Sequence, residues 1–324
     1  MSQEPSGLVD QMEHHQIAVY LGAMAAGTLV GWAAPAAGPG PEHAINPVLG
    51  ALLFVTFLQV PAAELVRFLR DGRFLAAALV VNFVVVPLVA AMFVFLPTDQ
   101  AVRIGVLLVL LCPCVDYVIV FSGLAGGSSR RLLASTPLLL VAQMLLLPGF
   151  LYLFMGSELA DIVEIGPFAE AFVVLIFIPP ALAWALQAWA ARRLVGQKIS
   201  DATTTMMVPL MAATLLVVVA SQVPKLGDGL ADVAAVIPFY VAFLIVMALA
   251  GKTVARLFRL DAPASRAIAF TGATRNSLVV LPLALALPDS LSVAAVVVVT
   301  QTLIEVLGMV VYVLGQESVR TRST

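Results

Sequence analysis

Charge is the scarcest property of this sequence. Asp, Glu, Lys and Arg make up 11% of its 324 residues, whereas a soluble domain typically carries about 25%. With a hydrophobic content of 61%, this scarcity excludes an ordinary soluble globular protein. Cysteine is scarce too: Cys112 and Cys114 are the only two, and they are too close in sequence to crosslink distant parts of a fold. The net charge of −2 gives no sign of a nucleic-acid partner.

Motifs that would indicate an enzyme are also missing. The sequence has no phosphate loop of the Walker type, so we expect no ATP hydrolysis by this chain. It has no His-Glu-x-x-His motif, and its three histidines, His14, His15 and His43, lie outside the long apolar runs. This argues against an intramembrane metalloprotease. We expect a protein that is not an enzyme and that has no metal site or cofactor.

Long apolar runs are what the sequence does have. A transmembrane helix needs about 20 predominantly apolar residues, and ten runs approach or exceed that length. They lie at about 16–35, 45–65, 74–96, 102–126, 132–155, 168–190, 204–223, 233–256, 265–287 and 291–314. Only short connectors and tails remain, and the acidic N-terminus has no basic region or cleavage site of a signal peptide. The sequence predicts one all-α polytopic membrane domain over 1–324, with the first segment retained.

The placement of Lys and Arg predicts the topology. If the N-terminus is cytoplasmic, 14 of the 17 basic residues lie in cytoplasmic connectors or the C-terminal tail, and only Arg103 and Lys225 lie on the opposite side. The cytoplasmic set is Arg67, Arg70, Arg73, Arg130, Arg131, Arg192, Arg193, Lys198, Lys252, Arg256, Arg259, Arg266, Arg320 and Arg322. This asymmetry follows the positive-inside rule. We predict ten spans with both termini in the cytoplasm.

An odd number of spans in each half predicts an inverted repeat, because the second group of five must then enter the membrane upside down. The expected repeats are about 16–155 and 168–314. Weak sequence similarities between the two halves agree with this division. Gln59-Val60-Pro61 and Gln222-Val223-Pro224 stand 163 residues apart, and an offset of 162 aligns Gln143 with Glu305.

Two of the ten segments carry helix-breaking residues near their middle. The segment 102–126 would be roughly 37 Å long as a helix, more than the roughly 30 Å of hydrocarbon, and it contains Pro113. Proline removes a backbone donor and clashes with the preceding turn, so we predict a break near 112–116. The segment 265–287 has Gly272 and Thr274 before Arg275-Asn276-Ser277, side chains that compete for backbone hydrogen bonds. Interrupted helices at matching positions of two halves indicate a binding site.

Three ionisable side chains fall inside predicted spans: Asp116, Arg275 and Glu305. An unpaired charge at the centre of a span costs about 2.5–3.5 kcal/mol on insertion scales. If the broken segments cross, Asp116 and Arg275 would pair and offset much of that cost. Such a pair has two readings, a structural link between half-helices or a functional pair opened by substrate or a proton. Both stay open at this point.

Polar side chains on other segments form candidate ion ligands. Gln301 and Thr302 lie one turn before Glu305, and Thr136 and Gln143 share a helical face because they are seven residues apart. Asn82 is a lone polar residue in the segment 74–96. Such residues serve either as hydrogen-bonding links between helices or as ion ligands. An oxygen-rich cluster suits Na⁺, whereas a titrating carboxylate suits coupling to H⁺.

The two cysteines can be interpreted as structural or as functional residues. A cysteine in a membrane segment is most often a small buried apolar residue. At a helix break beside charged residues, however, Cys114 in particular is a candidate ligand. A thiolate is a soft ligand, so trivalent arsenic or antimony would be a matching substrate.

Two motifs carry a family resemblance. The runs 112–127 (CPCVDYVIVFSGLAGG) and 270–277 (FTGATRNS) resemble the bile acid:sodium symporter superfamily, and within it the arsenite exporters of the yeast type. The resemblance implies two inverted halves of five helices with crossed, broken fourth and ninth helices. It also implies a core domain of segments three to five and eight to ten, and a panel domain of segments one, two, six and seven.

The resemblance extends to individual residues. Cys114 matches the functional cysteine of the arsenite exporters, and Phe270, Thr271 and Asn276 fit their ninth-segment pattern. Arg275 stands where that pattern has Asn, and Leu278 where it has an important Glu. Asp116 lies at the pseudo-symmetric position of segment four. It would take the place of the acid that the family has in segment nine.

These observations predict a secondary transporter of the plasma membrane that exports an arsenite- or antimonite-like solute against a proton gradient. The alternative is sodium-coupled symport of an organic anion whose carboxylate or sulfonate pairs with Arg275. The sequence has no soluble output domain, which argues against a non-transporting sensor or scaffold. A channel would need a continuous polar lining, whereas the polar residues here cluster near the middle of the spans.

The expected substrate-binding residues are Cys112, Cys114, Asp116, Arg275, Asn276 and Ser277. The expected ion-coupling residues are Asp116, Glu305, Gln143, Asn82, Thr136 and Gln301. Glycines at Gly22, Gly27 and Gly31 suit close helix packing, either within one chain or between chains.

Overall fold

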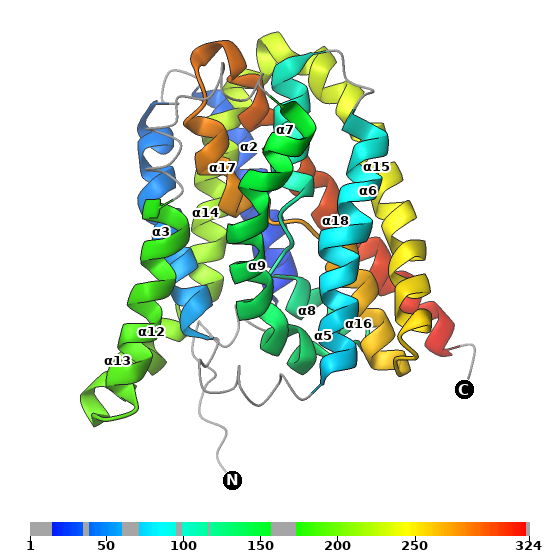
Figure 1. The fold of residues 1–324 in the computed structure, drawn as a ribbon. Coiled ribbons are helices and arrows are strands. Elements are labelled where there is room, and N and C mark those ends of the chain that lie inside the picture. The colour runs from blue at the N-terminus through cyan, green and yellow to red at the C-terminus, as the bar shows by residue number, and fades with distance from the viewer. Residues whose placement is uncertain are drawn as a thin grey trace. The chain divides into compact units, whose positions relative to one another are not determined.

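The computed structural model describes residues 15–34, 39–59, 71–94, 99–115, 117–156 and 173–321. Within these ranges all regular secondary structure is helical, and no strand forms (Figure 1). The chain divides into two units. Unit 1 comprises Met1–Pro61 and Ala169–Gly229, and unit 2 comprises Ala62–Phe168 and Leu230–Thr324. Each unit therefore takes helices from both halves of the sequence.

The helices of unit 1 pack through small and aromatic residues. Its elements are α2 (Gln16–Ala33), α3 (Pro39–Leu58), the π-helix η3 (Val173–Phe177), α12 (Ile178–Ala190), α13 (Leu194–Thr204), α14 (Met207–Gln222) and η4 (Val223–Lys225). The rings of Phe57 on α3 and Trp184 on α12 meet edge to face at 6.4 Å. On the next turn of α12, Gln187 Nε2 donates to the carbonyls of Phe57 and Leu58, which occupies acceptors that the end of α3 would otherwise leave open.

Two glycines set the distance between α2 and α14. A Cβ atom at Gly27 would lie 2.7 Å from the carbonyl oxygen of Leu216, and one at Gly31 would lie 2.8 Å from that of Ala220. These two glycines, four residues apart and thus on one helical face, pack α2 against α14 within the chain. Gly22 has open space around it.

Unit 2 contains the helices with breaks. Its elements are α5 (Gly72–Val80), the π-helix η2 (Val81–Val85), α6 (Val86–Val94), α7 (Gln100–Leu110), α8 (Tyr117–Leu124), α9 (Ser129–Met155), most of α15 (Leu226–Leu257), α16 (Ala262–Ala273), α17 (Ser277–Leu285), η5 (Asp289–Leu291) and α18 (Val293–Thr321). Acidic or amide side chains cap several of these helices. Asp99 accepts from the amide of Val102 at the start of α7, and Asn276 does the same for Val279 in α17.

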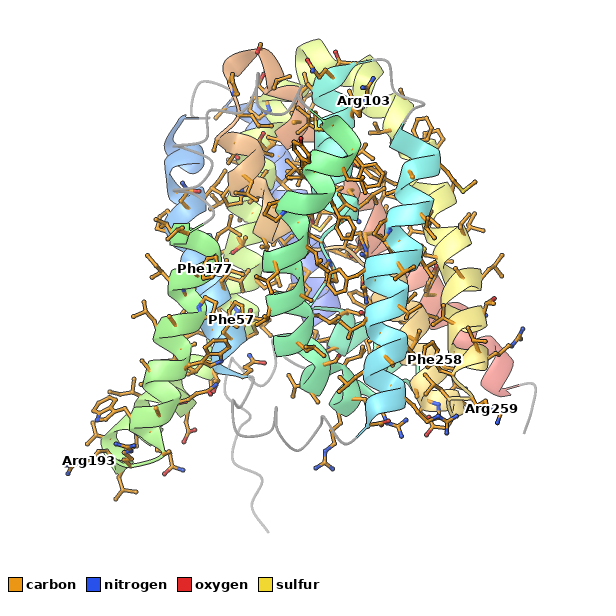
Figure 2. The ribbon with its side chains drawn as sticks, in the orientation of Figure 1. Phe57, Arg103, Phe177, Arg193, Phe258 and Arg259 are labelled. Atoms are coloured by element: carbon orange, nitrogen blue, oxygen red, sulfur yellow. The ribbon has the colours of Figure 1, made fainter. Side chains whose placement is uncertain are left out.

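The connector before α16 is fixed by Asp261. Its carboxylate accepts from the amide of Ala264 at 2.8 Å and pairs with the guanidinium of Arg131 at 2.8 Å. These two contacts, the amide first, hold the pKa of Asp261 below its ordinary value. At the same end of unit 2, Arg73 donates to the carbonyls of Phe258 and Arg259 in the turn that links α15 to α16. Figure 2 labels Phe258 and Arg259 in this turn.

Helices lie in the described part of every apolar range predicted from the sequence, and two of these ranges, 102–126 and 265–287, contain a non-helical break. By length and hydropathy, four of the described stretches qualify as membrane spans: Gly72–Met92, Leu138–Met155, Ala234–Leu257 and Val293–Val313. A fifth qualifies if α13 and α14, which meet at 45°, count as one. The chain is therefore a multi-pass membrane protein whose described part has only helices as regular structure. The full count of ten spans and the inverted repeat stay predictions, and α13 is a helix that we expected as a connector.

Candidate transport site at two paired helix breaks

Both predicted breaks are confirmed. The first lies between the end of α7 at Leu110 and the start of α8 at Tyr117, and the second between the end of α16 at Ala273 and the start of α17 at Ser277 (Figure 1). The positions of the breaks follow from local chemistry. Proline at 113 cannot continue the first helix, and Asn276 begins a new helix by capping it.

The two breaks pair with each other in an antiparallel β-bridge between Pro113 and Arg275. The amide of Cys114 donates to the carbonyl of Thr274 at 3.3 Å, and the amide of Asn276 donates to the carbonyl of Cys112 at 2.8 Å. Backbone groups at membrane depth have no water to bind, so irregular backbone there needs protein partners. Each break supplies those partners to the other.

Arg275 is completely buried, with 0% of its surface exposed. Its Nη1 donates to the carbonyl of Leu110 at 3.2 Å. Its Nη2 donates to the carbonyls of Thr271 at 2.6 Å and Gly272 at 2.8 Å, and to Oδ1 of Asn82 at 2.8 Å. The guanidinium therefore sits among four oxygens, three of them from the main chain.

The three carbonyls come from the C-terminal ends of α7 and α16. In a continuous helix, those of Thr271 and Gly272 would accept from the amides of Arg275 and Asn276. Those amides donate instead to Glu305 and to the other break. A helix C-terminus also carries partial negative charge. The guanidinium thus satisfies the open carbonyls of two helix ends and balances their charge. Phe243 on α15 covers it, with the guanidinium carbon 5.8 Å from the ring centre.

Glu305 lies on α18 and is 1% exposed. Its Oε2 accepts from the backbone amide of Arg275 at 2.7 Å and from Nε2 of Gln301, one turn earlier on the same helix. Close by on α18, Thr302 shares a hydrogen bond of 2.6 Å with Ser277, the first residue of α17. The polar stripe of α18 therefore lies in the interior of unit 2 and contacts the second break.

The other expected ion-coupling residues have different surroundings. Asn82, at 0% exposure, donates to the carbonyl of Ala78 and to the hydroxyl of Thr271 while it accepts from Arg275, so it positions the guanidinium. The hydroxyl of Thr136 donates to a carbonyl of its own helix. Gln143 on α9 is buried, and its Oε1 has no hydrogen-bond partner among the described residues.

Two amides at the paired breaks also have unsatisfied atoms. Nδ2 of Asn276 and Oε1 of Gln301 are buried and have no hydrogen-bond partner within the described part of the chain. Buried polar groups are nearly always satisfied by protein, water or ligand. These two atoms, one donor and one acceptor, can each bond to a water molecule or to a bound solute.

Cys112 and Cys114 are buried and are not joined in a disulfide, and both contribute backbone groups to the bridge. Asp116 falls outside the described residues, so its pairing with Arg275 stays a prediction. The carbonyls of Leu110, Thr271 and Gly272 were not among the residues expected at the site. Main-chain oxygens give no residue-type signal; the only available sign was the break itself, which leaves carbonyls open.

A family model described as the Sodium Bile acid symporter family matches residues 46–228, more than half of the chain. The matched range contains the first break and ends before the second. No curated protein matches the chain.

Proposed function

Because the chain belongs to the sodium bile acid symporter family, we propose that it is a secondary active transporter that works by alternating access and binds its solute at the paired breaks. Members of this family are transporters and not enzymes. The solute we favour is an arsenite- or antimonite-like species, exported across the plasma membrane in exchange for protons. The supporting observation is that two buried cysteines outside any disulfide, a buried arginine and a buried glutamate meet at one pair of helix breaks.

The surroundings of Arg275 favour protons over sodium as the coupling ion. In transporters with broken helices, unwound carbonyls and helix C-terminal ends are the groups that coordinate Na⁺. Here three such carbonyls already accept hydrogen bonds from a guanidinium. Arg275 acts as a covalently attached cation in that position, and a sodium ion would have to displace it.

Glu305 is the group we assign to proton coupling. Its carboxylate, 1% exposed, binds the backbone of the residue that carries the buried positive charge. Protonation would neutralise the carboxylate that accepts from this backbone amide and weaken its hold on the second break, which would change the relative stability of two arrangements of the breaks. We include Asp116 in the same charge-switching group on the basis of its position in the sequence.

Sodium-coupled symport of an organic anion is the second candidate, and the description of the family favours it. The hydroxyls of Ser277 and Thr302 and the unsatisfied amide oxygens of Gln143 and Gln301 are suitable ligands for a hard cation. A substrate carboxylate would, however, have to compete with four protein oxygens for the Nη atoms of Arg275.

Uptake of arsenite into everted membrane vesicles tests the proposal, with proton and sodium gradients applied separately. We expect uptake with the proton gradient, and we expect Cys114→Ser to abolish it while the amount of protein in the membrane stays the same. A matched Cys112→Ser variant reports whether the loss is specific to one thiol. Unchanged uptake by Cys114→Ser would exclude its role as a ligand. Uptake of an organic anion that depends on sodium alone would replace the proposal with its alternative.

A further inference from the structure

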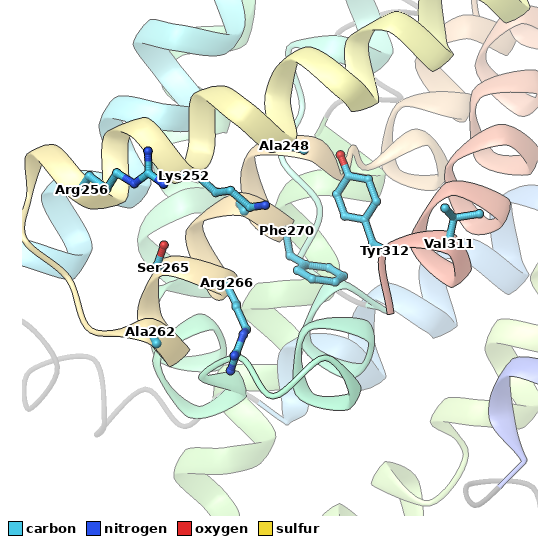
Figure 3. Close-up of a pocket in the computed structure, with 10 residues that line it drawn as sticks. Ala248, Lys252, Arg256, Ala262, Ser265, Arg266, Phe270, Val311 and Tyr312 are labelled. Carbon is cyan, nitrogen blue, oxygen red and sulfur yellow. The ribbon is translucent and has the colours of Figure 1, made fainter. Parts of the chain in front are cut away.

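A pocket of about 560 Å³ lies among α15, α16 and α18 of unit 2. Its polar lining is Lys252 and Arg256 from α15 with Ser265 and Arg266 from α16, and its apolar lining includes Phe270 and Tyr312. Figure 3 shows the two rings at one end of this group, with Arg256 at the other end and Lys252 between them. The proposed transport function makes no use of this pocket.

The pocket is strongly cationic. Three of its lining residues carry positive charge, and none of the lining residues, all in the described part of the chain, is Asp or Glu. Arg266 is held in place because its Nη1 donates to the carbonyl of Gly126 at 3.1 Å. Asp261, the acid at the start of α16, is already bound by Arg131 and by its own helix. An anion in the pocket would therefore meet positive charge with no competing carboxylate in its lining.

The other end of the pocket is apolar and rigid. Phe270 and Tyr312 meet edge to face with ring centres 5.6 Å apart, and the hydroxyl of Tyr312 donates to the carbonyl of Leu244. This contact orients the ring by fixing its polar edge. The result is an aromatic wall suited to the apolar part of a ligand.

The surface that continues from the pocket is apolar on both flanking helices. On α15, Ile245 and Leu249 are 59% and 63% exposed, and Lys252 and Arg256 follow at helical spacing on the same face. On α18, Leu307 and Val311 are 59% and 66% exposed. In a membrane protein, such exposed apolar side chains face the acyl chains, and cations at the end of the apolar stretch lie at headgroup depth.

We propose that this pocket binds an anionic phospholipid. Its phosphate would lie among Lys252, Arg256 and Arg266, with Ser265 as a hydrogen-bond donor, and an acyl chain would follow Leu249 and Val311. An amphiphile fits better than a free anion because the cationic group continues directly into a lipid-facing apolar surface. Basic pockets between membrane helices are known to select such headgroups.

The lipid would connect the helices that carry the two buried charges. Phe270 lies on α16, whose C-terminal end is capped by Arg275, and Tyr312 lies two turns after Glu305 on α18. A ligand seated against α15, α16 and α18 together stabilises the arrangement in which they are packed, because it binds that arrangement and not the unfolded chain. We therefore expect anionic lipid to raise the stability of the protein.

Thermal unfolding of the full chain, purified in a neutral detergent, tests this inference. Phosphatidylglycerol should raise the midpoint in a concentration-dependent way, and phosphatidylcholine and inorganic phosphate should not. Each cation near a lipid surface is worth about 1 kcal/mol, so Lys252→Gln with Arg256→Gln should weaken phosphatidylglycerol binding about thirtyfold. Native mass spectrometry counts the bound lipid independently.

The matched control removes two exposed cations elsewhere, by Arg192→Gln with Arg193→Gln, and should keep the full lipid effect. If the double variant at 252 and 256 is poorly expressed, each single variant should still show a partial loss of about fivefold. Equal effects of phosphatidylglycerol and phosphatidylcholine, or an equal loss in the control, would overturn the proposal. Stabilisation by inorganic phosphate alone would make the pocket a site for a free anion and would equally overturn it.

Discussion

Arg275 shows how one side chain makes a double helix break tolerable inside a membrane. Each buried carbonyl left without a partner costs about 1–3 kcal/mol, and the guanidinium serves three of them as well as the amide oxygen of Asn82. Its donors point in two fixed directions from a planar group, which suits acceptors that come from two different helix ends. The charge is balanced in turn by the partial negative charge of the two helix ends.

Replacing Arg275 with Gln should therefore destabilise the protein strongly. The substitution leaves three buried carbonyls and the amide oxygen of Asn82 without their donor, and each unsatisfied buried group costs about 1–3 kcal/mol. Arg275→Lys should cost less but remain clearly destabilising, because a single ammonium cannot reach four oxygens in the same geometry. The measurement is the thermal unfolding midpoint in detergent, together with the amount of protein in the membrane.

An arginine with similar bonds in an exposed place provides the control for this prediction. Arg73 also donates to main-chain carbonyls, those of Phe258 and Arg259, but water can replace it there. Arg73→Gln should cost no more than about 1 kcal/mol. If Arg73→Gln and Arg275→Gln lower the stability of the protein by the same amount, burial does not make the hydrogen bonds of Arg275 more stabilising than those of an exposed arginine.

A substitution at Glu305 separates its charge from its hydrogen bonds. In Glu305→Gln the side-chain oxygen can still accept from the amide of Arg275, but the group no longer titrates. We expect the variant to fold and to exchange solute across the membrane, and to lose accumulation driven by a proton gradient. Uptake measured over a range of external pH checks this. A pH profile identical to that of the original protein would remove Glu305 from the coupling mechanism.

At the scale of whole elements, glycines decide how closely helices approach. The Cβ atoms that alanine would add at Gly27 and Gly31 meet carbonyl oxygens of α14 at 2.7 and 2.8 Å. These are main-chain atoms and cannot rotate away, so α2 would have to shift as a body. Overpacking of this kind typically costs about 1–3 kcal/mol.

Gly27→Ala and Gly31→Ala should therefore each lower the thermal midpoint in detergent. Gly22→Ala, on the same helix but in open space, should leave it unchanged or raise it slightly, because alanine favours the helix by about 0.5–1 kcal/mol over glycine. Equal destabilisation by all three would mean that glycine is needed in α2 for a reason other than contact with α14.

Helix breaks could be predicted from the sequence, whereas the partners of helices and side chains could not. The breaks were predictable because Pro113 and the Arg275-Asn276-Ser277 run act on their own neighbourhood. The close face of α2 was predictable from glycine spacing, but its partner α14 was not, since the contact joins residues almost 190 positions apart, from Gly27 to Leu216. The partners of Arg275 were hidden for a different reason: they are main-chain carbonyls, which every residue has.

At the scale of the molecule, the distribution of charge is the clearest feature. Within unit 2, Figure 2 shows Arg103 at the opposite end from Phe258 and Arg259. This is the separation expected if Arg103 lies on the side of the membrane with few cations. The division into a core and a panel domain stays a prediction, and so does movement of one against the other.

The excess of cations predicts that both termini are cytoplasmic. Reporter fusions at the C-terminus test this. A fluorescent protein that folds only in the cytoplasm should be bright, and a phosphatase that is active only outside it should be inactive. The same phosphatase fused after Asp99, which immediately precedes α7 at the sparsely charged end, should be active. An active phosphatase at the C-terminus would contradict the topology.

The bridge between the breaks also has a consequence for biosynthesis. The carbonyl of Cys112 accepts from the amide of Asn276, a residue that is synthesised much later. At about 5–20 residues per second, the ribosome needs on the order of ten to thirty seconds to make the intervening chain. Until then α7 and α8, with 11 and 8 residues, are each too short to span the membrane and are joined by unpaired backbone. The backbone of the first break must therefore remain beside water or the insertion machinery until the second break is made.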